Sequence, residues 1–265
     1  MSQLIDQAYL RSAQYHNNTR LQTRIQFHKR FSVTQYDLLL WIFDRFRIPS
    51  PGCVLEVGCG SGDLWYTNQQ CIPSGWELTL SDFSVGMLRQ AQQQLSNVLH
   101  HMRFMVVDAQ TIPFADTMFD VVIANSMLYH VPDRAKALAE IHRVLKPAGR
   151  LYAATVGEAH LWELSELLGQ VDPSLSFWGS QPAISFTLDN GRQQLTPWFS
   201  DVTCSRYDDA LVVTEIEPLI TFLESFAPLN ESQRLDLIRA VEDEFVRQKG
   251  VLHITKDMGM FEAVK

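Results

Sequence analysis

The sequence predicts an α/β protein built around an open, doubly wound, mostly parallel β-sheet. Between Cys53 and Val156, short apolar runs alternate with segments of helical periodicity, the pattern of a parallel sheet covered by helices on both faces. A glycine-rich turn follows the first run, and an acidic or amide residue lies at the end of each of the first four. Ligands bind at the carboxyl edge of such sheets, so these residues mark the expected site.

Five apolar runs have the length of buried strands: residues 53–57, 76–82, 102–108, 119–125 and 150–156. Helical periodicity separates them, first over residues 61–70. Two further helices are expected after Ser84 and Asp133, because both residue types are favourable N-terminal caps and apolar residues follow at intervals of three and four. The second of these helices should end at residues 146–149, Lys-Pro-Ala-Gly.

The segments that flank this region follow different patterns. Residues 1–50 contain no strand signal and predict two or three helices, a helical cap that precedes a ligand-binding domain at residues 51–265. We expect the cap to become ordered over the site when a ligand binds. Residues 157–200 predict loops around one helix, and we expect them to be an insertion on the substrate side after the fifth strand.

The last third of the chain predicts further strands at residues 201–207, 251–255 and 260–264. Pro218 is a favourable residue for the start of a helix. A second helix is expected after Asn230, where Gln233 would complete a capping box. The inward side of this helix is expected to consist of Leu235, Ile238 and Phe245.

Charge and composition exclude several classes of protein. The 265 residues carry a net charge of −8, so the chain is a poor general ligand for phosphate backbones and we expect no nucleic-acid partner. Residues 1–50 differ, with seven basic and three acidic residues, and form either a solvated helix face or a site for one anionic group. No apolar stretch is long enough to span a membrane, and the four cysteines lack metal-ligand spacing. We expect a cytoplasmic protein without a metal site.

The sharpest motif is the glycine turn at residues 58–63, Gly-Cys-Gly-Ser-Gly-Asp, at the end of the first strand. Glycines allow a ligand to approach the backbone closely, and the N–H groups at the start of the next helix face it. A dinucleotide fingerprint would require a third glycine where Asp63 stands. Glu56, just before the turn, would repel a pyrophosphate and favours a ligand that carries an ammonium or sulfonium group.

Three further strand ends carry groups that suit an adenosine. Asp82, at the end of the second strand, can accept hydrogen bonds from both ribose hydroxyls. Asp108 can accept from an adenine amine while the backbone N–H of Ala109 donates to the ring. Asn125 ends the fourth strand, where the reacting end of the ligand is expected. The alternative is that each is an ordinary turn or cap residue, as Asp and Asn often are.

Four stretches of sequence resemble the class I S-adenosylmethionine-dependent methyltransferases. They are VLEVGCGSG at 54–62, LTLSDFSVGMLRQA at 78–91, VVDAQTIPFADTMFDVVIANSMLYHV at 106–131 and AEIHRVLKPAGRLYAAT at 139–155. The sequence is most similar to the small-molecule branch of that family, which includes the ubiquinone/menaquinone-biosynthesis type. The resemblance implies a Rossmann-like fold of seven strands, with one antiparallel strand between the fifth and sixth. Either 251–255 or 260–264 could take that place.

The resemblance also implies S-adenosylmethionine as the cofactor and in-line methyl transfer to a small molecule. The methionine end would lie against the glycine turn near Glu56, with Asn125 beneath the sulfonium, and Asp82 would bind the ribose. The residues implied in cofactor binding are Glu56, Gly58, Cys59, Gly60, Asp82, Phe83, Met87, Asp108, Ala109 and Asn125.

His130 is the candidate catalytic base, because methyltransferases of this type often have a histidine there, and a phenol or alcohol acceptor would need a base. The alternative is a histidine that orders the loop before Pro132. Tyr129 lines the acceptor pocket or simply packs. Candidates for a lid or for substrate contacts in the N-terminal segment are Tyr15, Arg24 and His28.

Four aromatic residues of 157–200 are expected to line a pocket for an aromatic or apolar acceptor: Trp162, Phe177, Trp178 and Phe186. The alternative is a small core beneath a long loop. Methylation of RNA or protein is a rival activity. The other rivals are a non-catalytic cofactor-binding protein and a dehydrogenase.

Overall fold

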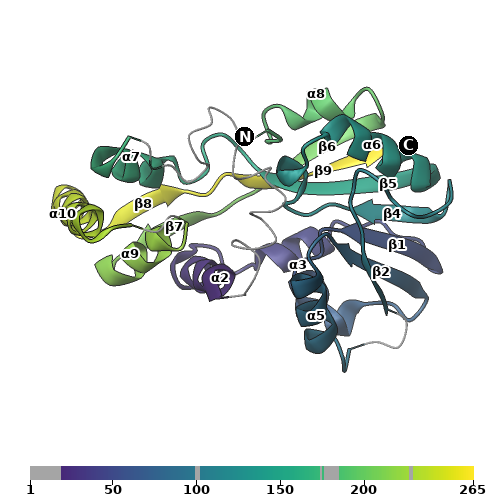
Figure 1. The fold of residues 1–265 in the computed structure, drawn as a ribbon, viewed down its shortest axis with the longest axis horizontal. Helices are drawn as coiled ribbons and strands as arrows, with labels where there is room; N and C mark the ends of the chain where they lie inside the picture. The colour runs from purple at the N-terminus through teal and green to yellow at the C-terminus, as the bar shows by residue number, and fades with distance from the viewer. Residues whose placement is uncertain (1–18, 99–101, 174, 176–184, 227–228) are drawn as a thin grey trace.

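A computed structural model describes residues 19–98, 102–173, 175, 185–226 and 229–265 of the chain. Within them, seven strands form one mostly parallel sheet in the order β3-β2-β1-β4-β5-β9-β6, which confirms the predicted fold (Figure 1). Their bounds are β1 Gly52–Val57, β2 Trp76–Asp82, β3 Met102–Val106, β4 Phe119–Ile123, β5 Leu145–Val156, β6 Ser200–Tyr207 and β9 Met258–Val264. The strand order reverses between β1 and β4, the position at which open α/β sheets bind ligands.

The antiparallel strand of the sheet is β9, which pairs with β5 on one side and β6 on the other. Of the two candidates for this place, residues 260–264 are therefore the correct one. The other candidate is β8 (Leu252–Thr255), which pairs instead with β7 (Ala210–Val213) in a separate two-stranded sheet. The sequence reading did not predict β7.

Helices cover the two faces of the central sheet in separate layers. Because successive residues of a strand point to opposite faces, Leu55 and Val54 of β1 belong to different layers. Leu55 packs with α6 (Arg134–Val144) and α8 (Gly191–Leu195). Val54 packs in the layer formed by α3 (Leu38–Phe43), α4 (Asp63–Thr67) and α5 (Val85–Gln94). Both faces are buried, as the continuous apolar runs predict.

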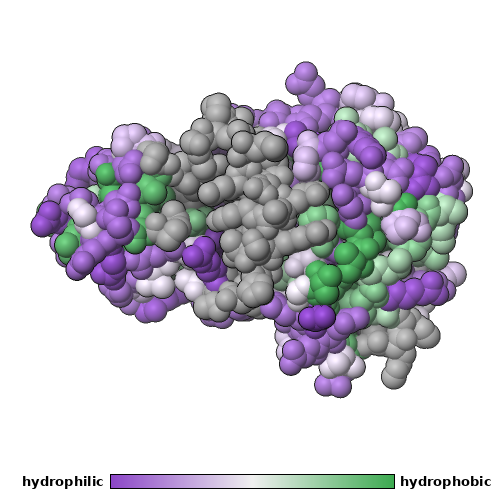
Figure 2. Space-filling model, viewed as in Figure 1, coloured by the Kyte–Doolittle hydropathy of each residue, from purple (hydrophilic) through white to green (hydrophobic). Residues whose placement is uncertain are grey.

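A second hydrophobic core, which the sequence reading did not predict, lies beyond the end of the central sheet. Here β7 and β8 pack with α2 (Thr19–Phe31), α7 (Trp162–Val171), α9 (Ile216–Glu224) and α10 (Glu231–Arg247). We call this group of elements the distal lobe; it lies on the left of Figure 1. In Figure 2, hydrophilic residues cover much of the distal lobe, where a small hydrophobic patch is also seen, and a larger band of hydrophobic residues lies over the central sheet.

The distal lobe is tied to the central sheet by a buried ion pair between Lys256 and Asp209. Lys256 lies between β8 and β9, and Asp209 lies between β6 and β7. The ion pair therefore joins the two connections through which the chain passes between the central sheet and the two-stranded sheet. The Lys256 ammonium also donates to the hydroxyl of Ser32, just after α2, at 2.9 Å. Oδ1 of Asp209 accepts from the backbone N–H of Thr34 at 3.1 Å, so the end of α2 is anchored to the same junction.

The helices around the sheet differ from the expected ones in three respects. The helix after the glycine turn is α4, which spans only five residues because Gly62, with φ of +82°, precedes it and a 3-10 turn follows at Gln69–Cys71. The described residues of 157–200 contain two helices, α7 and α8, rather than one. The segment 146–149 belongs to β5, which begins directly after α6. The predicted caps are present: the side chain of Ser84 accepts from the N–H of Met87, and that of Asp133 accepts from the N–H of Lys136.

Two expectations about the distal helices are corrected. α9 begins at Ile216, so Pro218 lies in its first turn, where its missing N–H is not needed. α10 has the predicted capping box of Asn230 and Gln233, but Leu235 is 50% exposed and does not face inward. The buried positions of α10 are Leu237, Val241 and Phe245.

Two of the four aromatic residues that were expected to line an acceptor pocket, Phe186 and Trp162, lie elsewhere. Phe186 is fully buried in the main core, with its ring 5.8 Å from that of Phe261. Trp162 is 46% exposed at the surface of the distal lobe. Phe177 and Trp178 lie outside the described residues. Across the described part of the chain, no helix is both long and apolar enough to cross a bilayer.

Candidate functional site

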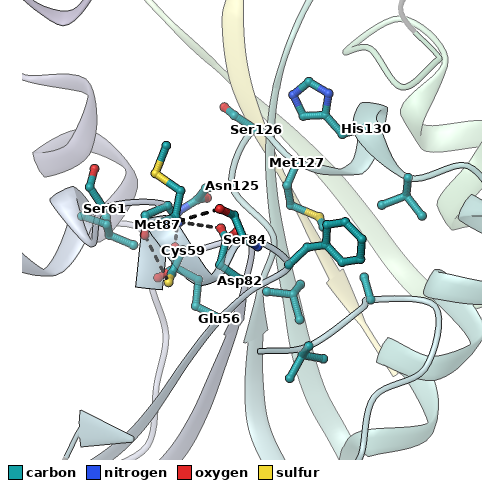
Figure 3. A pocket seen from close by; sticks show the side chains of 18 of the residues that line it. Glu56, Cys59, Ser61, Asp82, Ser84, Met87, Asn125, Ser126, Met127 and His130 are labelled. Carbon is teal, nitrogen blue, oxygen red and sulfur yellow. Dashed lines mark hydrogen bonds between the residues drawn. The ribbon is translucent and has the colours of Figure 1, made fainter. Parts of the chain in front are cut away.

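A cavity of about 410 Å³ opens at the carboxyl edge of the sheet, next to the reversal of strand order between β1 and β4. Its volume lies within the range of small-molecule sites. All ten residues proposed for cofactor binding line it: Glu56, Gly58, Cys59, Gly60, Asp82, Phe83, Met87, Asp108, Ala109 and Asn125. In Figure 3, Glu56, Cys59 and Asp82 lie at one end of the cavity, and Ser126 and His130 lie at the other.

The glycine turn forms one wall of the cavity. Gly58 and Gly60 have φ values of +73° and +56°, which favour glycine. A Cβ added at Gly58 would lie 2.8 Å from Cβ of Met127, so the turn also packs closely on the loop after β4. A Cβ at Gly60 would meet nothing within 4 Å. The backbone at Gly60 therefore faces open space, as a ligand cradle requires.

Asp82 stands at the end of β2 and holds the glycine turn in place. Its Oδ2 accepts from the N–H of Gly60 at 2.9 Å, and its Oδ1 accepts from the N–H of Ser84 at 2.7 Å. The N–H of Gly60 is thus used within the protein and is not left to face a ligand. Burial raises the pKa of Asp82, and these two hydrogen bonds oppose that shift. Each carboxylate oxygen keeps a second lone pair that can accept from a hydroxyl.

Glu56 is a buried carboxylate at the end of β1. Oε2 accepts from the indole N–H of Trp65 at 2.6 Å, and Oε1 lies 3.5 Å from Nδ2 of Asn125. Burial is the main reason that the pKa of Glu56 rises from 4.5 to about 7. Oδ1 of Asn125 is buried and has no hydrogen-bond partner among the described residues. Together they offer acceptor oxygens to a cation that enters the cavity.

The raised pKa of Glu56 predicts how ligand affinity changes with pH. A cationic ligand group requires the ionised carboxylate, so affinity for a ligand that carries an ammonium beside Glu56 should rise about tenfold between pH 6 and pH 8. In the ligand-free protein, the raised pKa lowers the free energy of unfolding as the pH rises. The stability that Glu56 contributes is complete below pH 4.5 and is lost as the pH rises through about 7.

Calorimetric titrations of S-adenosylhomocysteine, which carries such an ammonium, at several pH values would measure this dependence. Glu56→Gln should abolish the rise, and Glu77→Gln, on the exposed side of β2, should leave it intact. A wild-type affinity that stays constant from pH 6 to pH 8 would contradict the assignment of Glu56 to the cation.

Asp108 lies two residues beyond the end of β3, which is shorter than the predicted strand. Its Oδ1 accepts from the backbone N–H of Gln110 at 2.9 Å, and the Gln110 side chain donates to both carboxylate oxygens. Oε1 of Gln110 accepts from the N–H of Asp133, the cap of α6. Gln110 therefore links two loops at the rim of the cavity. No sequence pattern indicates this role of Gln110, because the link depends on two loops that meet only in the fold.

The loop after β4 forms the other end of the cavity. β4 stops at Ile123, two residues earlier than predicted, and Ser126 has a φ of +51°, a strained value for a non-glycine residue. Tyr129 is hydrogen-bonded to Ser126, and burial raises its pKa to about 12, so the phenol stays protonated at neutral pH. The His130 ring lies 4.5 Å from that of Tyr129, and both residues line the cavity.

The N-terminal helices supply a third wall. Arg24 of α2, a predicted lid or substrate residue, lines the cavity. Leu38, Leu39 and Ile42 of α3 also line it, and the sequence analysis did not predict these three. The run LLLWIF at 38–43 is apolar on every side of its helix, so periodicity alone could not show which residues face a ligand. Tyr15 lies outside the described residues.

His28 does not line this cavity. Its ring packs edge-on against Phe222 of α9, with 5.5 Å between ring centroids, and lies 6.4 Å from the ring of His160. Burial lowers the pKa of His28 to about 3, and the charge of Lys256 adds to the shift. His28 is therefore a neutral histidine of the distal lobe at physiological pH.

The fold and the cavity define a class of protein: a doubly wound sheet with a ligand site that combines a glycine turn, a diol-binding carboxylate and buried oxygens for a cation. Comparison with known proteins narrows the class. Residues 55–153 match the family model described as "Methyltransferase domain". A malonyl-[acyl-carrier protein] O-methyltransferase from Pseudescherichia vulneris is 30% identical over 186 residues, 69% of each chain. A ubiquinone/menaquinone biosynthesis C-methyltransferase from a Marinomonas species is 35% identical over 127 residues, 47% of this chain and 49% of that protein.

Solved structures agree on the fold. The YcgJ protein of Bacillus subtilis superimposes with a TM-score of 0.61 at 16% identity, over 86% of this chain and 97% of the other. A phosphoethanolamine N-methyltransferase 2 of Haemonchus contortus, solved in complex with S-adenosyl-L-methionine, gives 0.60 at 19% identity, over 98% of this chain and 59% of the other. The chain belongs to the class I S-adenosylmethionine-dependent methyltransferase family. It spans about half the length of the C-methyltransferase relatives that it matches.

The residues at the cavity fit the cofactor of that family. The space beside Gly60 leaves room for a ligand against the backbone. Oδ1 of Asn125 and the buried Glu56 carboxylate suit the ammonium of S-adenosylmethionine, and Asp82 suits its ribose. The absence of a third glycine, with Asp63 in its place, sets the site apart from a dinucleotide site.

Proposed function

We propose that this protein transfers a methyl group from S-adenosylmethionine to a small-molecule acceptor. The observation that supports this most strongly is one cavity with the carboxylates of Glu56 and Asp82 at one end and His130 at the other, and with Asp108 and Tyr129 also in its lining. The first end suits a cofactor, and the second leaves a place for an acceptor.

The cytoplasm is the proposed location of the protein, because its four cysteines are all free thiols and the cytoplasm is reducing.

The cofactor supplies a methyl group that is already activated on a sulfonium, so the protein has mainly to align the acceptor and exclude water. Leu38, Leu39 and Ile42 from α3 and Met127 and Val131 from the loop after β4 give the cavity an apolar wall. This lining supports an acceptor with an apolar or aromatic body. Residues 1–50 serve as the cap of the site in this proposal, since α2 and α3 both contribute to the lining.

His130 is proposed to take the proton of a phenol or alcohol acceptor, because it lines the acceptor end of the cavity. Tyr129 is unsuited to that role, since its pKa is raised to about 12. An acceptor that reacts through nitrogen or a stabilised carbanion needs no base, and His130 then serves to order the loop before Pro132. The backbone of this loop supports the second role, because the His130 N–H donates to Met127 within a 3-10 turn.

Methylation of RNA or protein is the main alternative. The segment after β4, Asn125-Ser126-Met127-Leu128, lacks the Pro-Pro-aromatic pattern used to methylate amino groups of bases and glutamine. The net charge of −8 also disfavours RNA.

A label-transfer assay tests the proposal. The protein is incubated with S-adenosylmethionine labelled at the methyl group and with a bacterial extract that is afterwards separated into small molecules, RNA and protein. We expect label in the small-molecule fraction, and a loss of that label with Asp82→Ala. Label that enters RNA or protein instead would contradict the proposed acceptor class.

A further inference from the structure

The charges around the cavity are unevenly distributed. Four carboxylates line it, those of Glu56, Asp63, Asp82 and Asp108. Among the described lining residues, Arg24 is the one Arg or Lys. It comes from α2, and no other described basic residue of that helix lines the cavity; Arg30, for example, forms an exposed ion pair with Glu215 at 2.6 Å. An anionic group in the cavity is repelled by the carboxylates and attracted by Arg24.

The guanidinium of Arg24 is held in one orientation by the end of α9. Its carbon lies 3.8 Å from the centroid of the Phe226 ring. Its Nε donates to the hydroxyl of Ser225 at 3.1 Å, and an Nη donates to the carbonyl of the same residue at 2.6 Å. Stacking and two hydrogen bonds reduce the entropy that this long side chain loses when it binds a ligand. A guanidinium presents five coplanar donors and matches the oxygens of carboxylates and phosphates in pairs.

Arg24 lines the same cavity as Tyr129 and His130. Its positive charge acts on the phenol of Tyr129, where it opposes the rise in pKa that burial causes. The ring of Tyr129 packs against that of His130, with 4.5 Å between the ring centroids. The apolar residues Leu38 and Leu39 line the same cavity. The surroundings of Arg24 thus combine an apolar wall with a fixed positive charge.

We propose that Arg24 is a specificity-determining residue that binds an anionic group, a carboxylate or a phosphate, on the methyl acceptor. The inference rests on the proposed function and narrows it: the acceptor is an amphipathic molecule with an apolar body and an anionic end.

The test uses the whole 265-residue chain saturated with S-adenosylhomocysteine and matched pairs of simple probes. Octanoate is compared with octanamide, and 3-phenylpropanoate with 3-phenylpropanamide; phenyl phosphate is added to separate phosphate from carboxylate recognition. Affinities are measured by ligand-observed NMR. We expect at least one anion to bind about tenfold more tightly than its neutral counterpart. Arg24→Met should reduce this ratio to about one, and Arg24→Lys should retain part of it.

Arg30→Met is the matched control, because Arg30 lies on the same helix and contacts the start of α9 but does not line the cavity. It should leave the ratio unchanged. The proposal is overturned if the amides bind as well as the anions, if no anion binds, or if Arg24→Met leaves the ratio intact.

The cofactor also has a carboxylate, so the affinity of each variant for S-adenosylhomocysteine and for methylthioadenosine, which lacks the amino-acid part, is measured as well. We expect neither to change with Arg24→Met. A loss for S-adenosylhomocysteine alone would assign Arg24 to the cofactor and overturn its role toward the acceptor. If the wild-type protein binds no S-adenosylhomocysteine at all, it is the proposed function that fails.

Discussion

Asp209→Asn is expected to lower the free energy of unfolding by about 3–5 kcal/mol, because it leaves the ammonium of Lys256 buried without its counter-ion. The side chains of Lys256 and Asp209 are 5% and 0% exposed, so water cannot take over the lost contact. Asp209 also accepts from Ser32, Thr34 and Ala210, and the substitution therefore loosens the end of α2 and the start of β7 together. Urea denaturation followed by circular dichroism would measure the change.

The exposed pair of Arg30 and Glu215 provides the matched control. Its side chains are 54% and 46% exposed, so Glu215→Gln should cost at most about 1 kcal/mol. Burial alone would raise the pKa of Asp209, but the hydrogen bonds from Lys256 and Thr34 outweigh it and hold the pKa below 3.8. Its contribution to stability is therefore present above pH 3.8 and lost as the pH falls through the lower folded-state value. A cost below 1 kcal/mol for Asp209→Asn would show that the pair does not anchor the junction.

Asp82→Ala is expected to weaken binding of S-adenosylhomocysteine by about 30- to 1000-fold, or about 2–4 kcal/mol. Two effects act together. The ribose hydroxyls lose a charged acceptor, and the N–H of Gly60 loses the partner that fixes the glycine turn. Isothermal titration calorimetry measures the affinity directly.

Asp82→Asn separates the two effects, since the amide keeps an oxygen for one hydrogen bond but removes the charge. We expect an affinity between those of the wild type and Asp82→Ala. Asp243→Asn, at an exposed position of α10, should bind as tightly as the wild type. Unchanged affinity in Asp82→Ala would remove Asp82 from the site.

The cofactor end of the site could be predicted from the sequence because it depends on local features. Parallel strands place their carboxyl ends on one edge, so the residues after the apolar runs, Glu56, Asp82, Asp108 and Asn125, had to come near one another. The glycine turn adds its own signal, since φ values such as +73° at Gly58 restrict which residues can stand there.

The distal lobe could not be predicted in the same way. β7 has four residues, too few for a reliable pattern, and its partner β8 lies about 40 residues further along the chain. The sequence 251–255 has the alternation of a strand, but nothing in it distinguishes the central sheet from a separate two-stranded one. The same limit applies to α2, where Arg24 and His28 are four residues apart and yet only Arg24 reaches the cavity.

The cavity at the ends of β1 and β4 is proposed to bind S-adenosylmethionine. Calorimetric titration of the wild-type protein with S-adenosylhomocysteine and, separately, with NADH tests it most directly. We expect S-adenosylhomocysteine to bind with a stoichiometry of one per chain and NADH to give no binding heat. Binding of NADH without binding of S-adenosylhomocysteine would contradict the claim and identify the site as one for dinucleotides.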